Sequence, residues 1–152
     1  MEEMQKMYGG MNIPDMPKPE KLSGTFRYLK DKAHTIEIMK RHASVMAPKF
    51  RTVSDILDRE IKPLGFASWN RPTGGYFVSL YTMPGTAKRT LALCKEAGVT
   101  MTGAGAAFPY GKDPKDSNIR IAPSLPPVEE LEQAIAVFCT CLKMAALEVL
   151  GV

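Results

Sequence analysis

The sequence predicts an α+β domain of two layers, in which helices pack on one face of a small, mostly antiparallel sheet. Two long segments place apolar residues at three- and four-residue steps, which is the spacing of one helix face. Between them lie short runs of β-favouring residues separated by turn-forming residues. The opening of the chain, with Pro14, Pro17 and Pro19, suits neither element. We therefore expect an extended Pro/Gly-rich linker or arm over residues 1–33 and a folded domain over residues 34–152.

The first helix is expected to begin at His34 or Thr35 and to end at Pro63 and Gly65. Pro48 falls within the pattern, so we expect a kink or a break there, because proline removes a backbone donor and crowds the preceding turn. The apolar stripe that predicts this helix comprises Ile36, Met39, Ala43, Met46, Phe50, Val53, Leu57 and Ile61.

A β-hairpin is expected after this helix. Phe66–Trp69 and Gly75–Tyr81 are the candidate strands, and the turn-forming stretch 70–74 separates them. The paired glycines Gly74 and Gly75 allow either a tight start to the second strand or a close backbone approach, and both interpretations stay open.

Shorter elements alternate in the second half of the domain. Helical spacing predicts a helix over Thr86–Ala97, and a brief strand follows at Val99–Met101. A loop rich in Gly, Pro and Lys, residues 103–116, precedes an alternating strand at residues 117–122. This loop resembles a dinucleotide-binding loop only superficially, because no helix follows its glycines. A final amphipathic helix is expected over residues 126–151.

Charge and composition argue against several classes of function. The net charge is +4, but the basic residues are scattered among acidic ones, so we expect no nucleic-acid partner. No apolar run approaches the ~18 residues of a membrane span, and the first residues carry no apolar signal segment, which predicts a cytoplasmic protein without membrane contact. Apart from Asp31 and Glu37, His34 and His42 lack companions at ligand spacing, so no metal is expected. The three cysteines are expected to be buried structural thiols: Cys94, Cys139 and Cys141.

Arg120 is the first candidate for a binding residue. Alternation along the last predicted strand places Asn118 and Arg120 on one face and Ile119 and Ile121 on the other. The apolar face would hold the strand to the helices, and the other face would present a guanidinium beside an amide. A planar guanidinium suits bidentate binding of a carboxylate. The alternative is an arginine that pairs with an acidic neighbour on a solvated face.

Several motifs follow one another in a fixed order before the acidic final helix. They are Pro72–Phe77 (PTGGYF), Gly85–Arg89 (GTAKR), Lys95–Val99 (KEAGV), Gly103–Gly111 (GAGAAFPYG) and Asn118–Ser124 (NIRIAPS). This series resembles the carboxyl-terminal small domain of fold-type I pyridoxal-phosphate (PLP) aminotransferases. In particular, it resembles the bacterial aspartate-aminotransferase-like subgroup, which carries Phe-Pro-Tyr-Gly-Lys-Asp-Pro before the arginine strand.

The resemblance implies roles for individual residues. Arg120 matches the arginine that grips the substrate α-carboxylate, and Phe77 or its neighbour Tyr76 matches the aromatic position that lines the substrate cleft. Asn118 would support Arg120, and the loop 103–111 would lie near the mouth of the cleft. The parent enzyme would use PLP to move an amino group between an aspartate-like amino acid and a 2-oxo acid.

The chain also departs from the family. The lysine that holds PLP, the phosphate anchors and the aspartate that pairs with the cofactor's ring nitrogen belong to the large domain, and nothing here resembles those segments. We therefore expect no catalytic residue, no PLP bound to this chain alone, and a partnership with the missing large domain. The apolar surface that faces that domain in the family would favour self-association. Two functions stay open: a fragment of an aminotransferase, or a free-standing binding or assembly module without catalysis.

Overall fold

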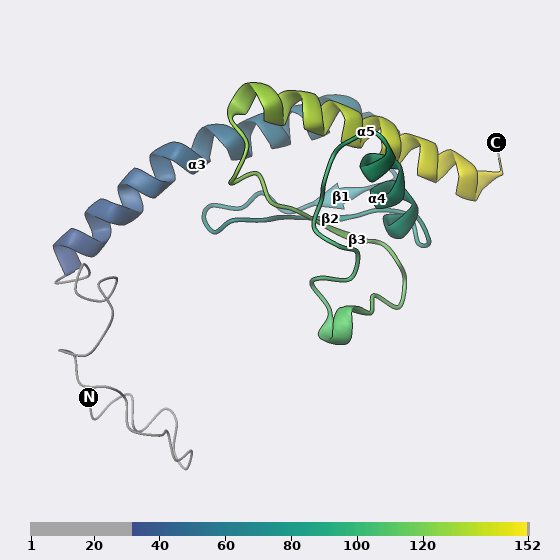
Figure 1. Ribbon diagram of the computed structural model, residues 1–152, viewed down its shortest axis with the longest axis horizontal. Coiled ribbons are helices and arrows are strands. Elements are labelled where there is room, and N and C mark those ends of the chain that lie inside the picture. The colour runs from purple at the N-terminus through teal and green to yellow at the C-terminus, as the bar shows by residue number, and fades with distance from the viewer. Residues whose placement is uncertain (1–31, 152) are drawn as a thin grey trace, which may run out of the picture. The chain divides into compact units, whose positions relative to one another are not determined.

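The computed structural model describes residues 32–151, and the chain divides into two compact units, residues 1–40 and 41–152. Of the first unit, the structure describes only the opening turns of helix α3 (Lys32–Glu60), and the predicted arm lies almost wholly outside the described residues. The described part of the second unit is an α+β domain in which helices pack on a small antiparallel sheet (Figure 1). The predicted fold class is confirmed.

Helix α3 continues through Pro48 as one element, so the predicted alternative of a break at this residue is wrong. The helix is buried only in its second half: Val53 and Leu57 are fully buried, whereas Met39 is 65% exposed. The apolar stripe therefore predicts the helix correctly but predicts its burial only from the middle onward. A short 3₁₀ turn at Lys62–Leu64 and the left-handed Gly65, with φ of 70°, end the helix where the sequence predicts.

The sheet has three strands in the described part of the chain, β1 (Ser68–Trp69), β2 (Val78–Tyr81) and β3 (Asn118–Ile121), in the order β1-β2-β3. Both pairings are antiparallel, so the predicted hairpin of β1 and β2 is confirmed. Strand β2 begins at Val78 and not at the predicted Gly75, and the Asn70 N–H donates to the Ser79 carbonyl at 3.2 Å, just beyond the end of β1.

The strand predicted at Val99–Met101 is wrong. The Val99 N–H instead donates to the Cys94 carbonyl, at 2.8 Å, and so closes the end of helix α4 (Ala87–Glu96). Gly98, with φ of 85°, makes this reversal possible. Val99 and Met101 pack half-buried against the core, which explains their apolar character without a strand.

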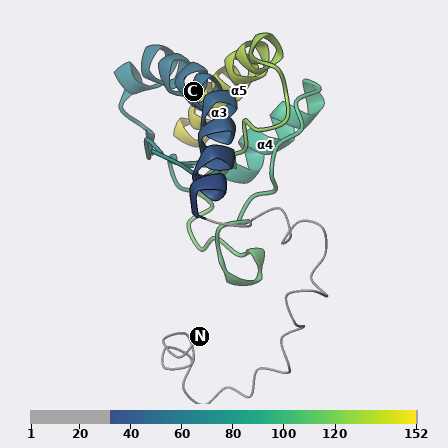
Figure 2. The same ribbon diagram turned by 90° about the vertical axis from the view of Figure 1, so that its left-hand side faces the viewer.

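Helices α4 and α5 (Val128–Leu150) pack against each other and against the sheet (Figures 1 and 2). Gly151, with φ of 74°, ends α5 as predicted. By length and composition alone α5 could cross a membrane, but core helices of soluble proteins pass the same test and eight of its residues are buried here. The largest side chains in the core include Phe138, Leu57, Ile61, Leu80, Ile119, Ile135 and Leu142.

Candidate functional site

Arg120 lies in the middle of β3, opposite Ser79 of β2. Its neighbours Ile119 and Ile121 are 1% and 2% exposed and belong to the core, whereas Arg120 is half-buried on the other face. The alternation predicted from the sequence is therefore confirmed for this strand. Because β3 ends at Ile121, the guanidinium is carried by a short strand that pairs with a single neighbour.

The guanidinium of Arg120 stacks on an aromatic ring and keeps one donor unused. Its Cζ atom lies 4.1 Å from the centroid of the Phe77 ring, which is a cation–π contact. Its Nε atom is buried and has no hydrogen-bond partner within the part of the chain that the structure describes. Among the same residues no carboxylate forms a salt bridge with Arg120, so the predicted alternative of an arginine paired with an acidic neighbour finds no support.

A buried cationic donor without an acceptor is costly, because such a group forfeits about 1–3 kcal/mol of hydrogen bonding. A carboxylate oxygen is the acceptor that best compensates a guanidinium, since the charge-assisted bond is shorter and stronger than a neutral one. The position of Arg120 thus has the chemistry of a carboxylate site.

Phe77 and Tyr76 lie at the end of the loop that joins β1 to β2. Phe77 is 40% exposed and supplies the ring under Arg120, while Tyr76 is 53% exposed and has no such ring contact. A salt bridge between Arg71 and Asp58 of α3 ties this loop to the helix. Of the two aromatic residues that the sequence proposes for the cleft, the geometry brings Phe77 to Arg120.

Asn118 lies two residues before Arg120, but its side chain is buried, with 1% exposed. Its Nδ2 donates to the Ser79 Oγ at 3.0 Å and to the Leu80 carbonyl at 3.4 Å. These bonds hold β3 against β2, and the described structure gives no bond between Asn118 and Arg120. The position fits the predicted supporting role, and a direct substrate contact stays a prediction.

Sequence reasoning missed Asp113, which anchors the beginning of the arginine strand. Its Oδ2 accepts the Ser117 N–H at 2.7 Å and the Asn118 N–H at 2.8 Å, and its Oδ1 accepts the Lys115 N–H at 3.0 Å. Burial alone raises the pKa of Asp113, but these backbone donors outweigh it and hold the pKa below its usual value. The signal in the sequence is the Asp-Pro pair before the strand, a pattern that favours turn initiation.

Asp116 accepts backbone amides at the start of helix α4. Its carbonyl accepts the Ala87 N–H at 3.0 Å and its Oδ1 accepts the Lys88 N–H at 3.2 Å, so it caps the first turn of α4 from outside the helix. Between Asp116 and the preceding helix, the chain forms a loop that projects from the sheet on the side away from α5 (Figures 1 and 2). Gly105 approaches the Gly111 carbonyl so closely that a Cβ atom would lie 2.2 Å from it.

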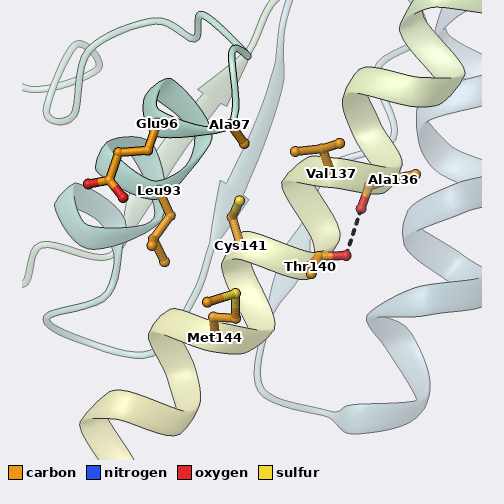
Figure 3. A pocket seen from close by; sticks show the side chains of 8 residues that line it. All are labelled: Leu93, Glu96, Ala97, Ala136, Val137, Thr140, Cys141 and Met144. Atoms are coloured by element: carbon orange, nitrogen blue, oxygen red, sulfur yellow. Dashed lines mark hydrogen bonds between the residues drawn. The ribbon is translucent and has the colours of Figure 1, made fainter.

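A hollow lies between α4 and α5, on the helix side of the sheet (Figure 3). It measures about 490 Å³ and is mainly apolar; Leu93 and Cys141 point into it (Figure 3). Burial raises the pKa of the Cys94 thiol to about 12, with Cys141 adding to the effect, and burial also raises the pKa of Cys139 to about 12. All three cysteines are buried and free, as predicted for structural thiols.

The two least exposed lysines of the described residues are Lys49 and Lys143, and both make contacts within the domain. PLP chemistry requires an available lysine amine. The Nζ of Lys49 donates to the Ser124 carbonyl at 2.7 Å, and the Nζ of Lys143 pairs with Glu60 at 2.9 Å. Within residues 34–151, no group of three or more His, Cys, Asp or Glu side chains could hold a metal ion.

Known proteins similar to this chain are aminotransferases. A family model described as aspartate amino-transferase matches residues 4–151. An aspartate aminotransferase of Corynebacterium glutamicum is 49% identical over 122 residues, a match that covers 80% of this chain and 28% of that protein. A crystal structure of an aspartate transaminase from the same species has a TM-score of 0.78 at 48% identity and covers 82% of this chain and 29% of that one.

A more distant structure shares the fold alone. It is the α-aminoadipate aminotransferase of Thermus thermophilus, complexed with N-(5'-phosphopyridoxyl)-L-leucine, with a TM-score of 0.66, 21% identity, and coverage of 80% of this chain and 30% of that one. The chain therefore spans less than a third of the length of these relatives.

Proposed function

The chain belongs to the aspartate aminotransferase family, as its carboxyl-terminal domain, and we propose that its Arg120 binds the α-carboxylate of the amino acid or 2-oxo acid that the complete enzyme converts. The observation that carries this proposal is the buried Nε of Arg120, which has no acceptor among the described residues while its guanidinium rests on Phe77. A substrate carboxylate supplies that acceptor. An aspartate-like substrate is favoured by the 49% identity with an aspartate aminotransferase.

The other site residues support Arg120 in this proposal. Phe77 lines the cleft and fixes the plane of the Arg120 guanidinium, and Tyr76 flanks the guanidinium from the same loop. Asn118 bonds β3 to Ser79 of β2. The family implies PLP in the complete enzyme, where the cofactor supplies the chemistry of amino-group transfer. This chain contributes orientation and charge at the carboxylate end of the substrate.

This chain alone is proposed to be inactive and to bind no PLP specifically. The proposal is supported by the coverage of less than a third of the relatives and by the engagement of Lys49 and Lys143 elsewhere. Titration of the purified chain with PLP should give no saturable 1:1 absorbance change. A stoichiometric spectral change that disappears in one Lys→Arg variant would contradict it.

We also infer self-association and a cytoplasmic location, with no nucleic-acid or membrane partner. The last turns of α5 expose Met144, Leu147, Val149 and Leu150, which favours contact with a second protein surface. The first turn of α5 carries Glu129 and Glu130, which disfavours contact of this end of the helix with anionic membranes and nucleic acids. Light scattering over a range of concentrations tests the self-association, and a monomer throughout would contradict it.

The carboxylate site is testable on the chain itself. We expect succinate to shift the NMR signal of the Arg120 Nε–H in a saturable way, because this donor is buried and finds no acceptor in the part of the chain that the structure describes. The signal is identified by its loss in Arg120→Lys, and sodium chloride at equal ionic strength is the control for screening. A wild-type chain whose Arg120 signal does not respond to succinate would overturn the proposed role.

A further inference from the structure

The beginning of β3 depends on a carboxylate that lies outside the strand. The strand spans only Asn118–Ile121 and pairs with β2 alone, so its first amides have few partners within the sheet. Asp113 takes up two consecutive ones, those of Ser117 and Asn118, through the same oxygen. Unpaired backbone donors at a strand end allow fraying, so this carboxylate fixes where the strand begins.

Asn118 is held through both its backbone and its side chain. Its backbone N–H bonds to Asp113 at 2.8 Å, and its side-chain Nδ2 bonds to the Ser79 Oγ at 3.0 Å. Ser79 is also the residue that lies opposite Arg120 in the ladder. A short series of bonds therefore links Asp113, through Asn118, to Ser79, the residue opposite Arg120.

We propose that Asp113 is a positioning residue for carboxylate binding, which acts through Asn118 and the start of β3 to place the Arg120 guanidinium over Phe77. The inference rests on the proposed function of Arg120. It deepens that function by assigning a role to an acidic side chain outside the substrate contact. Asp113 accepts three backbone amides, and no salt bridge joins it to Arg120 among the described residues, so its carboxylate is directed to the backbone and not to the guanidinium.

Asp116 provides a matched control on the same loop. It is also an aspartate that accepts backbone amides, but its side chain bonds to Lys88 of α4 and not to β3. Loss of its carboxylate should lower stability without changing the position of Arg120. A comparison of the two aspartates therefore separates positioning from general stabilisation of the loop.

The test measures succinate binding to the 152-residue chain through the Arg120 Nε–H signal in wild type, Asp113→Ala, Asp113→Asn and Asp116→Asn. We expect the dissociation constant to rise about tenfold in Asp113→Ala and about threefold in Asp113→Asn, because misplaced binding groups lose affinity steeply with distance. Asparagine keeps one acceptor oxygen and should rescue part of the loss. Asp116→Asn should bind succinate like wild type.

The outcomes are distinguishable. Equal affinities in wild type and both Asp113 variants, with a responsive wild type, overturn the role of Asp113 and leave that of Arg120 intact. A wild-type signal that does not respond to succinate overturns both. If Asp113→Ala does not fold, the result for Asp113→Asn decides, together with that for Ser79→Ala. The Ser79→Ala change removes the hydroxyl that accepts from the Asn118 side-chain Nδ2, and it should also weaken succinate binding. A loss of affinity in Asp116→Asn equal to that in Asp113→Asn would also overturn the proposal, since it indicates general loosening.

Discussion

The two faces of the small sheet are built from alternate residues of the same strands but have different purposes. Toward the helices, Val78, Leu80, Ile119 and Ile121 are between 0% and 2% exposed and form the floor of the core. Away from the helices, Ser79 and Arg120 face each other in the ladder. One face therefore stabilises the fold, and the other carries the half-buried guanidinium of Arg120, the proposed carboxylate-binding group. A shift of register by one residue would exchange the two roles, so the core fixes the site.

The largest effect is expected on the inner face. Leu80→Ala should lower the free energy of unfolding by about 2–5 kcal/mol, because it leaves a cavity under the helices. Urea unfolding of the purified chain measures this change. The control is Tyr81→Ala, the next residue on the same strand, which is 49% exposed and should change stability far less. Similar losses in the two variants would show that the two faces are not distinct.

The outer face should respond in binding and hardly in stability. Arg120→Ala in the complete aminotransferase should raise KM for the amino-acid substrate about 10- to 100-fold, which corresponds to the loss of a charge-assisted bond of about 1.5–3 kcal/mol. The melting temperature of the variant should stay close to that of wild type. Arg120→Lys keeps the charge but loses the planar pair of donors, so it should recover only part of the affinity. Unchanged steady-state kinetics in both variants would remove Arg120 from the site.

The aromatic ring under the guanidinium should contribute less. Phe77→Leu removes the cation–π contact, which is worth about 0.5–2 kcal/mol, and should weaken carboxylate binding about 2- to 30-fold. Tyr76→Leu, in the neighbouring position, should have little effect on the same titration. This pair sharpens the choice between the two aromatic residues that the sequence leaves open. A larger loss in the Tyr76 variant would reverse the assignment.

Local patterns predicted the features that depend on local geometry. Alternation along residues 118–121 placed Arg120 and the isoleucines on the correct faces, and helical spacing found the three α-helices of residues 32–151. Specific backbone bonds decided the rest. The Val99 N–H closes helix α4 and forms no strand, β2 begins only at Val78, and the contacts of Asp113 depend on how its loop folds back on β3. These contacts leave no periodic signal in the sequence.

The smallest expected effect is the change of stability with pH that is due to Asp113 at the start of β3. The folded-state pKa of Asp113 is lowered by its backbone donors, so its contribution to stability is present above the unfolded pKa, near 3.8, and is lost as the pH falls through the still lower folded value. Salt bridges also lower the pKa values of Glu60 and Glu148, so the contributions of these two carboxylates to stability are lost in the acid range as well. Thermal melts of wild type and Asp113→Asn between about pH 2 and 6 therefore isolate the part due to Asp113, because both chains share the other carboxylates. The difference in melting temperature should shrink below about pH 4, and a difference that is constant with pH would show that the carboxylate charge at Asp113 does not hold the strand.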